Sequence, residues 1–294
     1  MDVLIVGGTG FIGTTLTTEL LDRGHDVTVL SRNPGTADLP EGVEEVAGDV
    51  TAYDSIEGAF EGMDAVVNLV ALSPLFKPKG GLTHETVHLG GTENVVEAAQ
   101  AHGVGRLLQM SALGADPDGP TAYIRAKGAA EEVVTASDLD WVVVRPSVVF
   151  GDGGEFVSFT KKLTPGPVAK VLPGGGTTRF QPIWVGDLVP MLADALEDDA
   201  HIGETYEIGG PEVLTLAAVT RLAYEAEGKA AKIVPMPMPL AKLGLTVAGP
   251  LPFVPMGPDQ ARSLEFDNTT DDNDADVFVD DIEELTTLRE YLFA

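Results

Sequence analysis

DVLIVGGTGFIG, residues 2–13, joins an apolar run to a glycine-rich turn that opens an amphipathic segment. Val3–Val6 is a strand candidate, and the helical pattern Phe11–Arg23 follows at once. Between them the glycines are spaced G-x-x-G-x-x-G and, from Gly8, G-x-G-x-x-G. A turn without Cβ atoms lets a pyrophosphate approach bare backbone, and the helix N-terminus supplies N–H donors. This order of strand, turn and helix predicts a dinucleotide-binding unit, with an ordinary glycine-rich turn as the alternative.

The same alternation of apolar runs and helical patterns continues to about residue 150. The strand candidates are Val3–Val6, Val27–Leu30, Val43–Ala47, Ala65–Leu69, Leu107–Met110 and Trp141–Val144. The helical stretches between them are Phe11–Arg23, Ser55–Phe60, His84–His102 and Thr121–Ser137. Strands that alternate with helices indicate βαβ units and a parallel sheet. We therefore predict an α/β fold with a Rossmann-type doubly wound parallel sheet, residues 1–150 forming the NADP(H)-binding domain.

After residue 150 glycine and proline become frequent and the strand candidates become short. The helices expected here are Asp187–Leu196, which Asp187 would cap, Leu216–Glu227 and an amphipathic segment at Asp280–Leu292. Residues 267–281 are strongly acidic and predict a solvated loop. We therefore predict a smaller C-terminal α/β lobe over residues 151–294, interwoven with the first domain, that binds a substrate or a partner.

The end of the second strand, Leu30-Ser31-Arg32-Asn33, bears on the choice between the two dinucleotides. An acidic residue there would bind the ribose 2′-hydroxyl of NAD, whereas an arginine accommodates the 2′-phosphate of NADP. This chain has no acid at that point. Arg32 can bind a phosphate through two N–H groups, and Ser31 can donate a hydrogen bond to it. The sequence therefore predicts NADP(H) in preference to NAD(H), the alternative being a surface arginine after a strand.

Further nucleotide contacts are expected where the third and fourth strands end. Asp49-Val50 is placed to meet the adenine edge, and Leu69-Val70-Ala71 would pass near the pyrophosphate and ribose. Ordinary strand-end structure is the alternative for both segments. With the glycine turn, the predicted cofactor-binding residues are Gly7, Thr9, Gly10, Phe11, Ile12, Gly13, Ser31, Arg32, Asp49, Val50, Leu69, Val70 and Ala71.

Tyr123 and Lys127 form Y-x-x-x-K at the start of a predicted helix, one turn apart on one face. Ser111 ends the preceding strand candidate. An ammonium group near the phenol would lower its pKa from about 10 toward neutral. Tyr123 would then exchange a proton with a substrate oxygen that Ser111 holds. We predict these three residues as a catalytic set beside a nicotinamide, with a solvated helix face as the alternative.

The charge balance is strongly acidic, with 18 lysines and arginines against 46 aspartates and glutamates and a net charge of -28. A dispersed excess of this size would repel phosphate backbones, which argues against nucleic-acid binding. It also exceeds what solubility requires. We interpret it as adaptation to a salt-loving cell, where molar salt shortens the screening length to roughly 3 Å. An acidic functional surface is the alternative.

The absence of cysteine excludes disulfides, thiolate nucleophiles and cysteine-ligated metals, and we predict no metal site. The mean hydropathy of +0.12 is typical of a globular protein. We find no basic leader before the first strand and no uninterrupted apolar run of membrane-spanning length. We therefore expect a cytoplasmic protein, and for the oligomeric state, which these features leave open, we favour a monomer.

Five features follow one another along the chain, namely the glycine turn, Asp49, Ser111, the Tyr123-x-x-x-Lys127 motif and the segment Arg145–Gly151. In the order of these features the chain resembles the short-chain dehydrogenase/reductase superfamily, in its extended and atypical branches. The resemblance implies that the tyrosine and lysine of the motif also contact the cofactor. Two further contacts to the nicotinamide are implied at Pro146 and Val148. Most extended members carry an asparagine where this chain has His88, and that asparagine helps a proton-relay water. His88 is then either its substitute or a structural histidine.

Four further segments resemble one branch of this superfamily. They are His88–Thr92, Met110–Ala115, Phe180–Asp187 and Tyr206–Pro211. In these segments the chain is similar to the nucleotide-binding accessory subunit of respiratory complex I and to its free-standing prokaryotic relatives. This resemblance implies bound NADPH, peripheral association with a membrane respiratory complex, and a nucleotide that is held without turnover.

Two functions therefore remain open. The candidate pocket walls are Leu72–Leu82, Phe150–Phe159, Phe180–Trp184 and Pro235–Met256. They are apolar and aromatic, which suits an apolar carbonyl, an isoprenoid or a quinone-like substrate better than a nucleotide sugar. We predict an NADP(H)-dependent oxidoreductase that acts on such a small molecule. The alternative is a non-catalytic, nucleotide-holding accessory or assembly protein of a respiratory NADH dehydrogenase complex.

Overall fold

The computed structural model describes residues 1–78, 80–163, 169–240 and 258–294. The chain divides into two compact units that interleave along the sequence. Unit 1 comprises Met1–Leu72, Gly80–Pro146 and Val185–Glu207; unit 2 comprises Ser73–Lys79, Ser147–Trp184 and Ile208–Ala294. The chain thus enters unit 2 at Ser73, Ser147 and Ile208 and returns to unit 1 at Gly80 and Val185, so neither unit is one continuous half of the sequence.

Unit 1 is built on a seven-stranded sheet with the order β11-β6-β5-β4-β1-β2-β3. Its strands are β1 (Asp2–Val6), β2 (Asp26–Ser31), β3 (Glu44–Ala47), β4 (Ala65–Asn68), β5 (Arg106–Met110), β6 (Asp140–Pro146) and β11 (Thr205–Ile208). The pairings from β3 across to β6 are all parallel. The order reverses between β1 and β4, as it does in a doubly wound nucleotide-binding sheet. The predicted fold class is confirmed.

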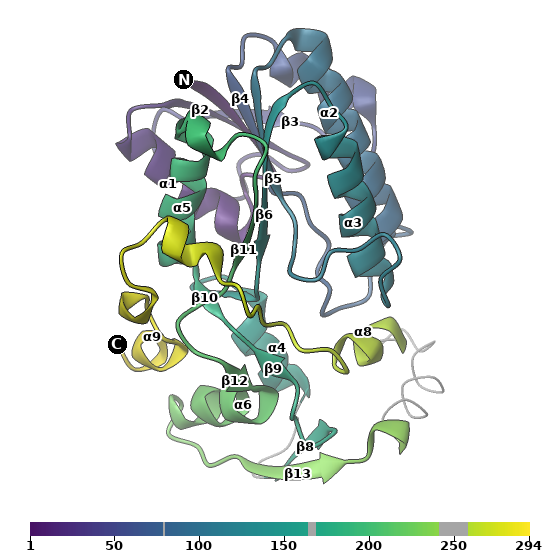
Figure 1. Ribbon diagram of the computed structural model, residues 1–294, viewed down its shortest axis with the longest axis vertical. Coiled ribbons are helices and arrows are strands. Elements are labelled where there is room, and N and C mark those ends of the chain that lie inside the picture. The colour runs from purple at the N-terminus through teal and green to yellow at the C-terminus, as the bar shows by residue number, and fades with distance from the viewer. Residues whose placement is uncertain (79, 164–168, 241–257) are drawn as a thin grey trace. The chain divides into compact units, whose positions relative to one another are not determined.

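Helices cover both faces of this sheet (Figure 1). Helices α1 (Phe11–Asp22) and α5 (Val185–Glu197) lie on one face, and α2 (Gly90–His102) and α3 (Ala122–Thr135) lie on the other. The prediction of one helix over Ser55–Phe60 was wrong, since two short 3-10 helices, η1 (Tyr53–Ser55) and η2 (Glu57–Phe60), occupy this region. The expected helix from His84 also begins differently, with a π-helical turn, η3 (Glu85–Leu89), before α2.

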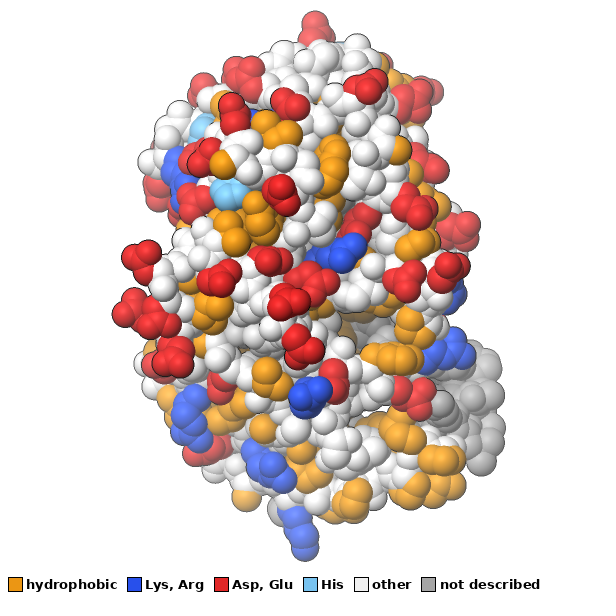
Figure 2. Space-filling model, in the orientation of Figure 1, with side chains coloured by type: hydrophobic (Ala, Val, Ile, Leu, Met, Phe, Trp, Pro, Cys, Tyr) orange, Lys and Arg blue, Asp and Glu red, His pale blue; other side chains and the backbone are white. Residues whose placement is uncertain are grey.

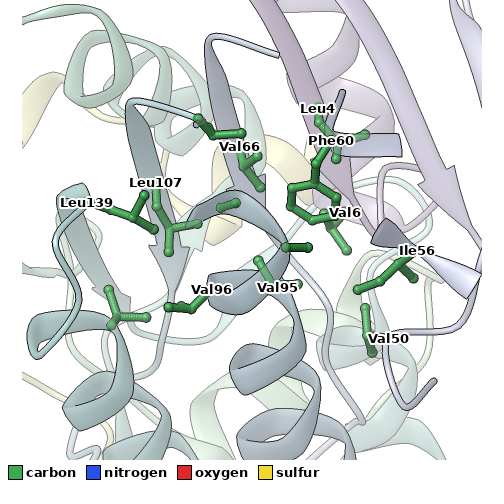
Figure 3. Packing of buried hydrophobic residues seen from close by; sticks show 14 of the residues in the cluster. Leu4, Val6, Val50, Ile56, Phe60, Val66, Val95, Val96, Leu107 and Leu139 are labelled. Carbon is green, nitrogen blue, oxygen red and sulfur yellow. The ribbon is translucent and has the colours of Figure 1, made fainter. Parts of the chain in front are cut away.

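The core of unit 1 fills the space between the sheet and helix α2 (Figure 3). Leu4, Val66 and Leu107 come from three neighbouring strands and are fully buried. They pack in one cluster with Val95 of α2 and Phe60 of η2. Burying an aliphatic or aromatic side chain of this size contributes about 1.5–3 kcal/mol. This packing fixes the carboxyl ends of β1, β4 and β5, at which the candidate site lies.

Unit 2 consists of short strand pairs and helices. Its strands are β7 (Val149–Phe150), β8 (Ala169–Pro173), β9 (Arg179–Phe180), β10 (Ile183–Trp184), β12 (Leu214–Thr215) and β13 (Lys232–Met236). Strands β7 and β10 and strands β8 and β13 pair in parallel, whereas β9 and β12 are antiparallel. Its helices are α4 (Glu155–Leu163), α6 (Leu216–Glu225), α8 (Pro258–Ser263) and α9 (Leu288–Phe293). That this lobe binds a substrate or a partner stays a prediction.

The acidic segment 267–281 exposes most of its acids, and its two asparagines form hydrogen bonds with other parts of the chain. Asn268 accepts hydrogen bonds from the Ser147 hydroxyl at 2.8 Å and from the Val148 N–H at 2.9 Å. Asn273 exchanges two hydrogen bonds with the backbone of Gly209. A short 3-10 helix, η5 (Asp274–Val277), lies within it. Its two asparagines therefore bind the segment to the rest of unit 2, a role that its acidic composition does not indicate.

Two expectations about helix ends were also wrong. Asp187 lies in the first turn of α5, two residues after the helix begins at Val185, so it does not cap that helix. The single helix expected at Asp280–Leu292 is a 3-10 turn, η6 (Ile282–Glu284), followed by the separate helix α9. Most of the candidate wall Pro235–Met256 lies outside the described residues. No helix in the described ranges is long and apolar enough to cross a membrane.

Candidate functional site

A cavity of about 360 Å³ lies in unit 1, where strands β1 to β4 end. Its lining residues are Gly7, Thr9–Gly13, Leu30–Asn33, Thr36, Gly48–Val50, Leu69–Leu72, Leu82 and Val87. Every cofactor-binding residue predicted between Gly7 and Ala71 is among them. Thr36, Gly48 and Val87 are additional lining residues that the sequence analysis missed, because they carry no motif of their own. Leu72 and Leu82, which bound one of the candidate substrate-pocket walls, line this cavity instead.

The glycine turn brings the first helix against the backbone of the first strand. Gly7 has a φ of +88°, a conformation that L side chains rarely adopt. Its N–H donates to the carbonyl oxygen of Leu30 at 2.8 Å. A Cβ on Gly13 would lie 2.6 Å from the Cα of Gly8, so no larger residue fits there without a shift. The cradle thus leaves backbone N–H groups at the start of α1 open to a pyrophosphate.

The end of β2 presents two donors that pair with no part of the described chain. Ser31 is buried, and its Oγ has no hydrogen-bond partner among the described residues. The exposed Arg32 side chain forms no ion pair or hydrogen bond with any residue that the structure describes. Almost all of the other arginines are paired with acids or carbonyl groups. A free hydroxyl beside a free guanidinium fits a phosphate group of the cofactor.

Asp49 lines the same cavity and is held in one orientation. Its Oδ1 accepts from the backbone N–H of Thr51 at 3.0 Å and from the Thr51 hydroxyl at 2.8 Å. These hydrogen bonds, the backbone one first, together with the charge of Arg32, lower the pKa of Asp49. The carboxylate is therefore ionised and fixed, as a hydrogen-bond acceptor for an exocyclic amino group should be.

Two of the three predicted catalytic residues, Ser111 and Lys127, lie at the carboxyl end of β5. The N–H of Ser111 donates to the carbonyl oxygen of Val144 at 2.7 Å, which fixes the residue beside β6. Its Oγ is buried and has no hydrogen-bond partner within the described part of the chain. Lys127 is 2% exposed, and its Nζ donates to the carbonyl oxygen of Met110 at 2.8 Å. Tyr123 lies in the first turn of α3, which the Thr121 side chain caps.

Burial shifts the pKa of both titratable groups of this set. It lowers the pKa of Lys127 to about 8, and the charge of Glu131 partly opposes that shift. It raises the pKa of Tyr123, which is opposite to the lowering that the sequence analysis expected. The expectation was wrong because burial desolvates the phenolate, and the Lys127 ammonium group donates to the Met110 carbonyl oxygen instead. At neutral pH Tyr123 therefore carries its proton, which is the form that can donate to a substrate oxygen.

Two buried histidines face Tyr123, and only one of them was singled out from the sequence. The rings of His84 and His88 stack at 5.5 Å, and the ring of Tyr123 meets each edge-on at 5.4 Å. Nε2 of His88 accepts from the backbone N–H of Leu72 at 3.2 Å, at the end of the cavity lining. The i, i+4 spacing of the pair was readable, but the π-helical turn that buries both rings was not.

A buried chain of amide groups connects the cavity to Lys127. Asn68 accepts from the N–H of Val70, which lines the cavity, at 3.3 Å. Its Nδ2 donates to Oε1 of Gln109 at 2.9 Å. Gln109 in turn donates to the carbonyl oxygen of Met110 at 3.3 Å, the same oxygen that accepts from Lys127. The two buried amides therefore fix the ends of β4 and β5, which carry the cavity wall at Val70 and the Lys127 contact at Met110.

The family model described as NAD(P)H-binding matches residues 7–170, which include the glycine cradle, Ser111, Tyr123 and Lys127. This chain belongs to the extended short-chain dehydrogenase/reductase superfamily. The match spans more than half of the chain and includes every residue that lines the cavity.

Two relatives of this superfamily member differ in what their names state. This chain is 30% identical over 296 residues to NADH dehydrogenase [ubiquinone] 1 alpha subcomplex subunit 9, mitochondrial, of Arabidopsis thaliana. The match covers 92% of this chain and 71% of the relative. The chain is 31% identical over 261 residues to a 3 beta-hydroxysteroid dehydrogenase/Delta 5-->4-isomerase of Mycobacterium tuberculosis, covering 77% and 70%. One relative is thus named as a respiratory subunit and the other as an enzyme.

The fold of this superfamily member is shared with solved epimerase structures. A nucleoside-diphosphate-sugar epimerase from Staphylococcus aureus matches with a TM-score of 0.76 and 21% identity, over all of both chains. At this identity the likeness shows the fold alone.

The last two predicted nucleotide contacts lie outside the cavity lining, as do Tyr123 and Lys127. Pro146 ends β6, and its carbonyl oxygen accepts from the N–H of Leu113 at 3.1 Å, just beyond Ser111. Val148 belongs to unit 2 of this superfamily member, where its N–H donates to Asn268. The nicotinamide contacts of both residues stay predictions.

Proposed function

We propose that this protein is an NADP(H)-dependent oxidoreductase that acts on an apolar carbonyl, isoprenoid or quinone-like substrate in the cytoplasm. The observation that carries the proposal is a set of three groups at the end of β5 and on α3. These are the unpartnered Ser111 hydroxyl, the Tyr123 phenol and the buried Lys127 ammonium. A protein that only holds a nucleotide has no use for a buried ammonium group beside an unsatisfied hydroxyl, both of which cost stability.

Each residue of this set has a distinct role in the proposed reduction. The Ser111 hydroxyl donates a hydrogen bond to the substrate oxygen and orients it. Tyr123, protonated because burial raises its pKa, transfers its proton to that oxygen. The positive charge of Lys127 then stabilises the phenolate that remains. NADPH, when bound, would supply the hydride for the carbon atom, so that the carbonyl would gain one hydride and the proton from Tyr123 and become an alcohol.

The preference for NADP(H) rests on Ser31 and Arg32. Both are part of the cavity lining, and neither donor has a partner among the residues described. A 2′-phosphate would accept from the Ser31 hydroxyl and pair with the guanidinium of Arg32. An apolar substrate is supported by the relative from Mycobacterium tuberculosis, whose name states a hydroxysteroid, and by the apolar composition of the predicted pocket walls.

The proposal is tested by turnover of NADPH in molar KCl with a panel of quinones, ketosteroids and apolar aldehydes. At least one compound should be reduced, and Tyr123→Phe should lower kcat by roughly 10²–10⁴-fold. The affinity for NADPH should stay within about twofold, because the phenol is not part of the cavity lining. Tyr53→Phe, in the remote η1 turn, is the matched control and should behave as wild type. Tight NADPH binding with no Tyr123-dependent turnover of any compound would refute catalysis.

The second candidate is a nucleotide-holding accessory or assembly protein of a respiratory NADH dehydrogenase. The likeness to the Arabidopsis thaliana subunit, over 92% of this chain, is the observation that favours it. In that case the protein should co-purify with respiratory subunits from gently prepared membranes and release its nucleotide slowly. Recovery of the whole protein in the soluble fraction, with fast exchange of bound NADPH, would argue for the enzyme instead.

A further inference from the structure

His88 has a protonation state that its surroundings decide. Its Nε2 accepts a hydrogen bond from the backbone N–H of Leu72 at 3.2 Å, and an amide N–H has only one proton to give. Nε2 is therefore unprotonated. A neutral imidazole carries its single proton on the other ring nitrogen, so the hydrogen bond from Leu72 places that proton on Nδ1.

The imidazolium form is excluded by the groups packed around the ring. His88 is 2% exposed, and desolvation lowers its pKa most strongly. The positive charge of Lys127 on α3 and the neighbouring ring of His84 in the same turn lower it further, to about 2. The hydrogen bond with the Leu72 backbone opposes this lowering only in part, and the third neighbour, Tyr123, is uncharged at neutral pH. His88 therefore cannot take up and release a second proton as a relay would have to.

The remaining N–H of His88 has nothing to bind within the described residues. Nδ1 is buried and has no hydrogen-bond partner among them. A buried donor without an acceptor destabilises the fold, so its presence points to an acceptor that a bound molecule supplies. The ring sits in the π-helical turn η3, and irregular turns of this kind are frequent at functional sites. Ser111, which directly follows β5, likewise keeps a buried hydroxyl without a partner in the described chain.

We propose that His88 is a permanently neutral hydrogen-bond donor whose Nδ1–H binds the carbonyl oxygen of a molecule held beside Tyr123. This assignment rests on the proposed function, because it places a bound molecule next to the tyrosine. It makes His88 a positioning residue for that carbonyl group and excludes it from proton transfer. Two molecules carry such an oxygen, namely the carboxamide of the nicotinamide and a carbonyl substrate, and the test separates them.

The test is nitrogen-15 NMR of the full protein labelled on its five histidines, with His88 assigned from a His88→Asn sample. Without ligand, Nδ1 of His88 should resonate as a protonated nitrogen and Nε2 as an unprotonated one. Neither signal should change between about pH 5 and pH 8. An unprotonated Nδ1, or titration of His88 within that range, would overturn the assignment.

Ligand additions then identify the acceptor. A shift of the Nδ1 signal on adding NADPH, but not on adding 2′-phospho-ADP-ribose, which lacks the nicotinamide, would identify the carboxamide. A shift that needs a short-chain quinone or a ketosteroid in addition would identify the substrate carbonyl. If Nδ1 responds to none of these, the proposed ligand contact is wrong. The spectra need no turnover, so a failure of the proposed oxidoreductase activity is read separately from a failure here.

Variants give a second readout. His88→Leu removes the donor while keeping an apolar side chain, and should weaken binding of the carbonyl-bearing molecule roughly two- to tenfold. The affinity for 2′-phospho-ADP-ribose should be unchanged, which shows that the cavity is intact. His88→Asn keeps an N–H donor and should recover part of the loss. Equal losses of affinity for the carbonyl-bearing molecule and for 2′-phospho-ADP-ribose, in both variants, would mean that His88 serves only to pack the turn.

Discussion

The ammonium group of Lys127 and the carbonyl oxygen of Met110 form a buried hydrogen bond of 2.8 Å. This contact holds a positive charge one residue before Ser111, at the carboxyl end of β5. The same carbonyl accepts from Gln109, so the lysine is joined to the buried amides that support the cavity. Burial of this charge has a measurable consequence for stability.

Folding stability should rise with pH between about 8 and 10 because of Lys127. Burial lowers its pKa to about 8 in the folded protein, whereas an unfolded lysine titrates near 10.4. Across this window the unfolded state binds more protons, so deprotonation favours the folded state, by about 1–3 kcal/mol in total. Above pH 10 the raised pKa of Tyr123 reverses the trend, because the folded state then retains the extra proton.

The free energy of unfolding is measured by denaturant titration at fixed molar KCl, at about pH 7.5 and about pH 10. These two pH values lie on either side of the Lys127 pKa of about 8. Lys127→Met is the control, since it fills the same space without a titratable group. It should be more stable than wild type at the lower pH and should lose most of the pH dependence. An identical pH dependence in both proteins would show that the charge of Lys127 is not desolvated.

The glycine cradle should not tolerate a single methyl group at position 13. A Cβ there would meet the backbone of Gly8 at 2.6 Å, and backbone cannot move aside cheaply. We expect Gly13→Ala to cost about 1–3 kcal/mol of stability and to weaken nucleotide binding. Gly58→Ala is the matched control, because a Cβ at Gly58 has open space, and it should be neutral or slightly stabilising. The measurement is the thermal midpoint of each variant with and without NADPH. Equal changes in the midpoint for both variants would contradict the close packing of Gly13 against Gly8.

Much of unit 1 could be predicted because its strands are apolar runs of ordinary length. The predicted strands β1, β2, β4, β5 and β6 agree with the structure to within one or two residues at each end. The seventh strand, β11, was missed, since Thr205–Ile208 is short and returns to the sheet from a distant part of the chain. No local pattern reports such a tertiary pairing.

The candidate site was predictable to the extent that its chemistry is written in motifs. Ser31 and Arg32 follow a strand end, and the structure places both in the cavity. What could not be read from the sequence was burial, which reversed the expected direction of the pKa shift of Tyr123. The stacking of His84 on His88 was hidden as well, because it depends on a π-helical turn that has no sequence signature.

Ser31→Ala should separate stability from cofactor choice. The hydroxyl is buried and has no partner in the part of the chain that the structure describes, so removing it should leave the thermal midpoint unchanged or slightly raised. The affinity for NADPH should fall roughly two- to tenfold, whereas the affinity for NADH should stay the same. Differential scanning fluorimetry and calorimetric titration give both numbers. A lowered midpoint, or equal losses for the two cofactors, would assign the hydroxyl a structural role.

Stability and NADPH affinity should both rise as KCl increases from about 0.1 M to above 1 M. Acidic side chains are dispersed over the face seen in Figure 2, and the net charge is -28. The screening length shortens from about 10 Å to about 3 Å over this range, which relieves repulsion among the acids. A neutral osmolyte at equal osmolality is the control, because it is excluded from the surface without screening charge. A thermal midpoint that is flat in KCl would contradict the halophilic interpretation.

The most direct test of an NADP(H) protein is calorimetric titration of NADPH and NADH into wild type and Arg32→Ala in molar KCl. Arg32 lines the cavity beside Ser31 and pairs with no acid within the described ranges, so its guanidinium is available to the 2′-phosphate. We expect wild type to bind NADPH more tightly than NADH. The substitution should cost roughly 1–3 kcal/mol for NADPH and leave NADH almost unchanged. Equal losses for both cofactors, or a wild type that prefers NADH, would contradict the account.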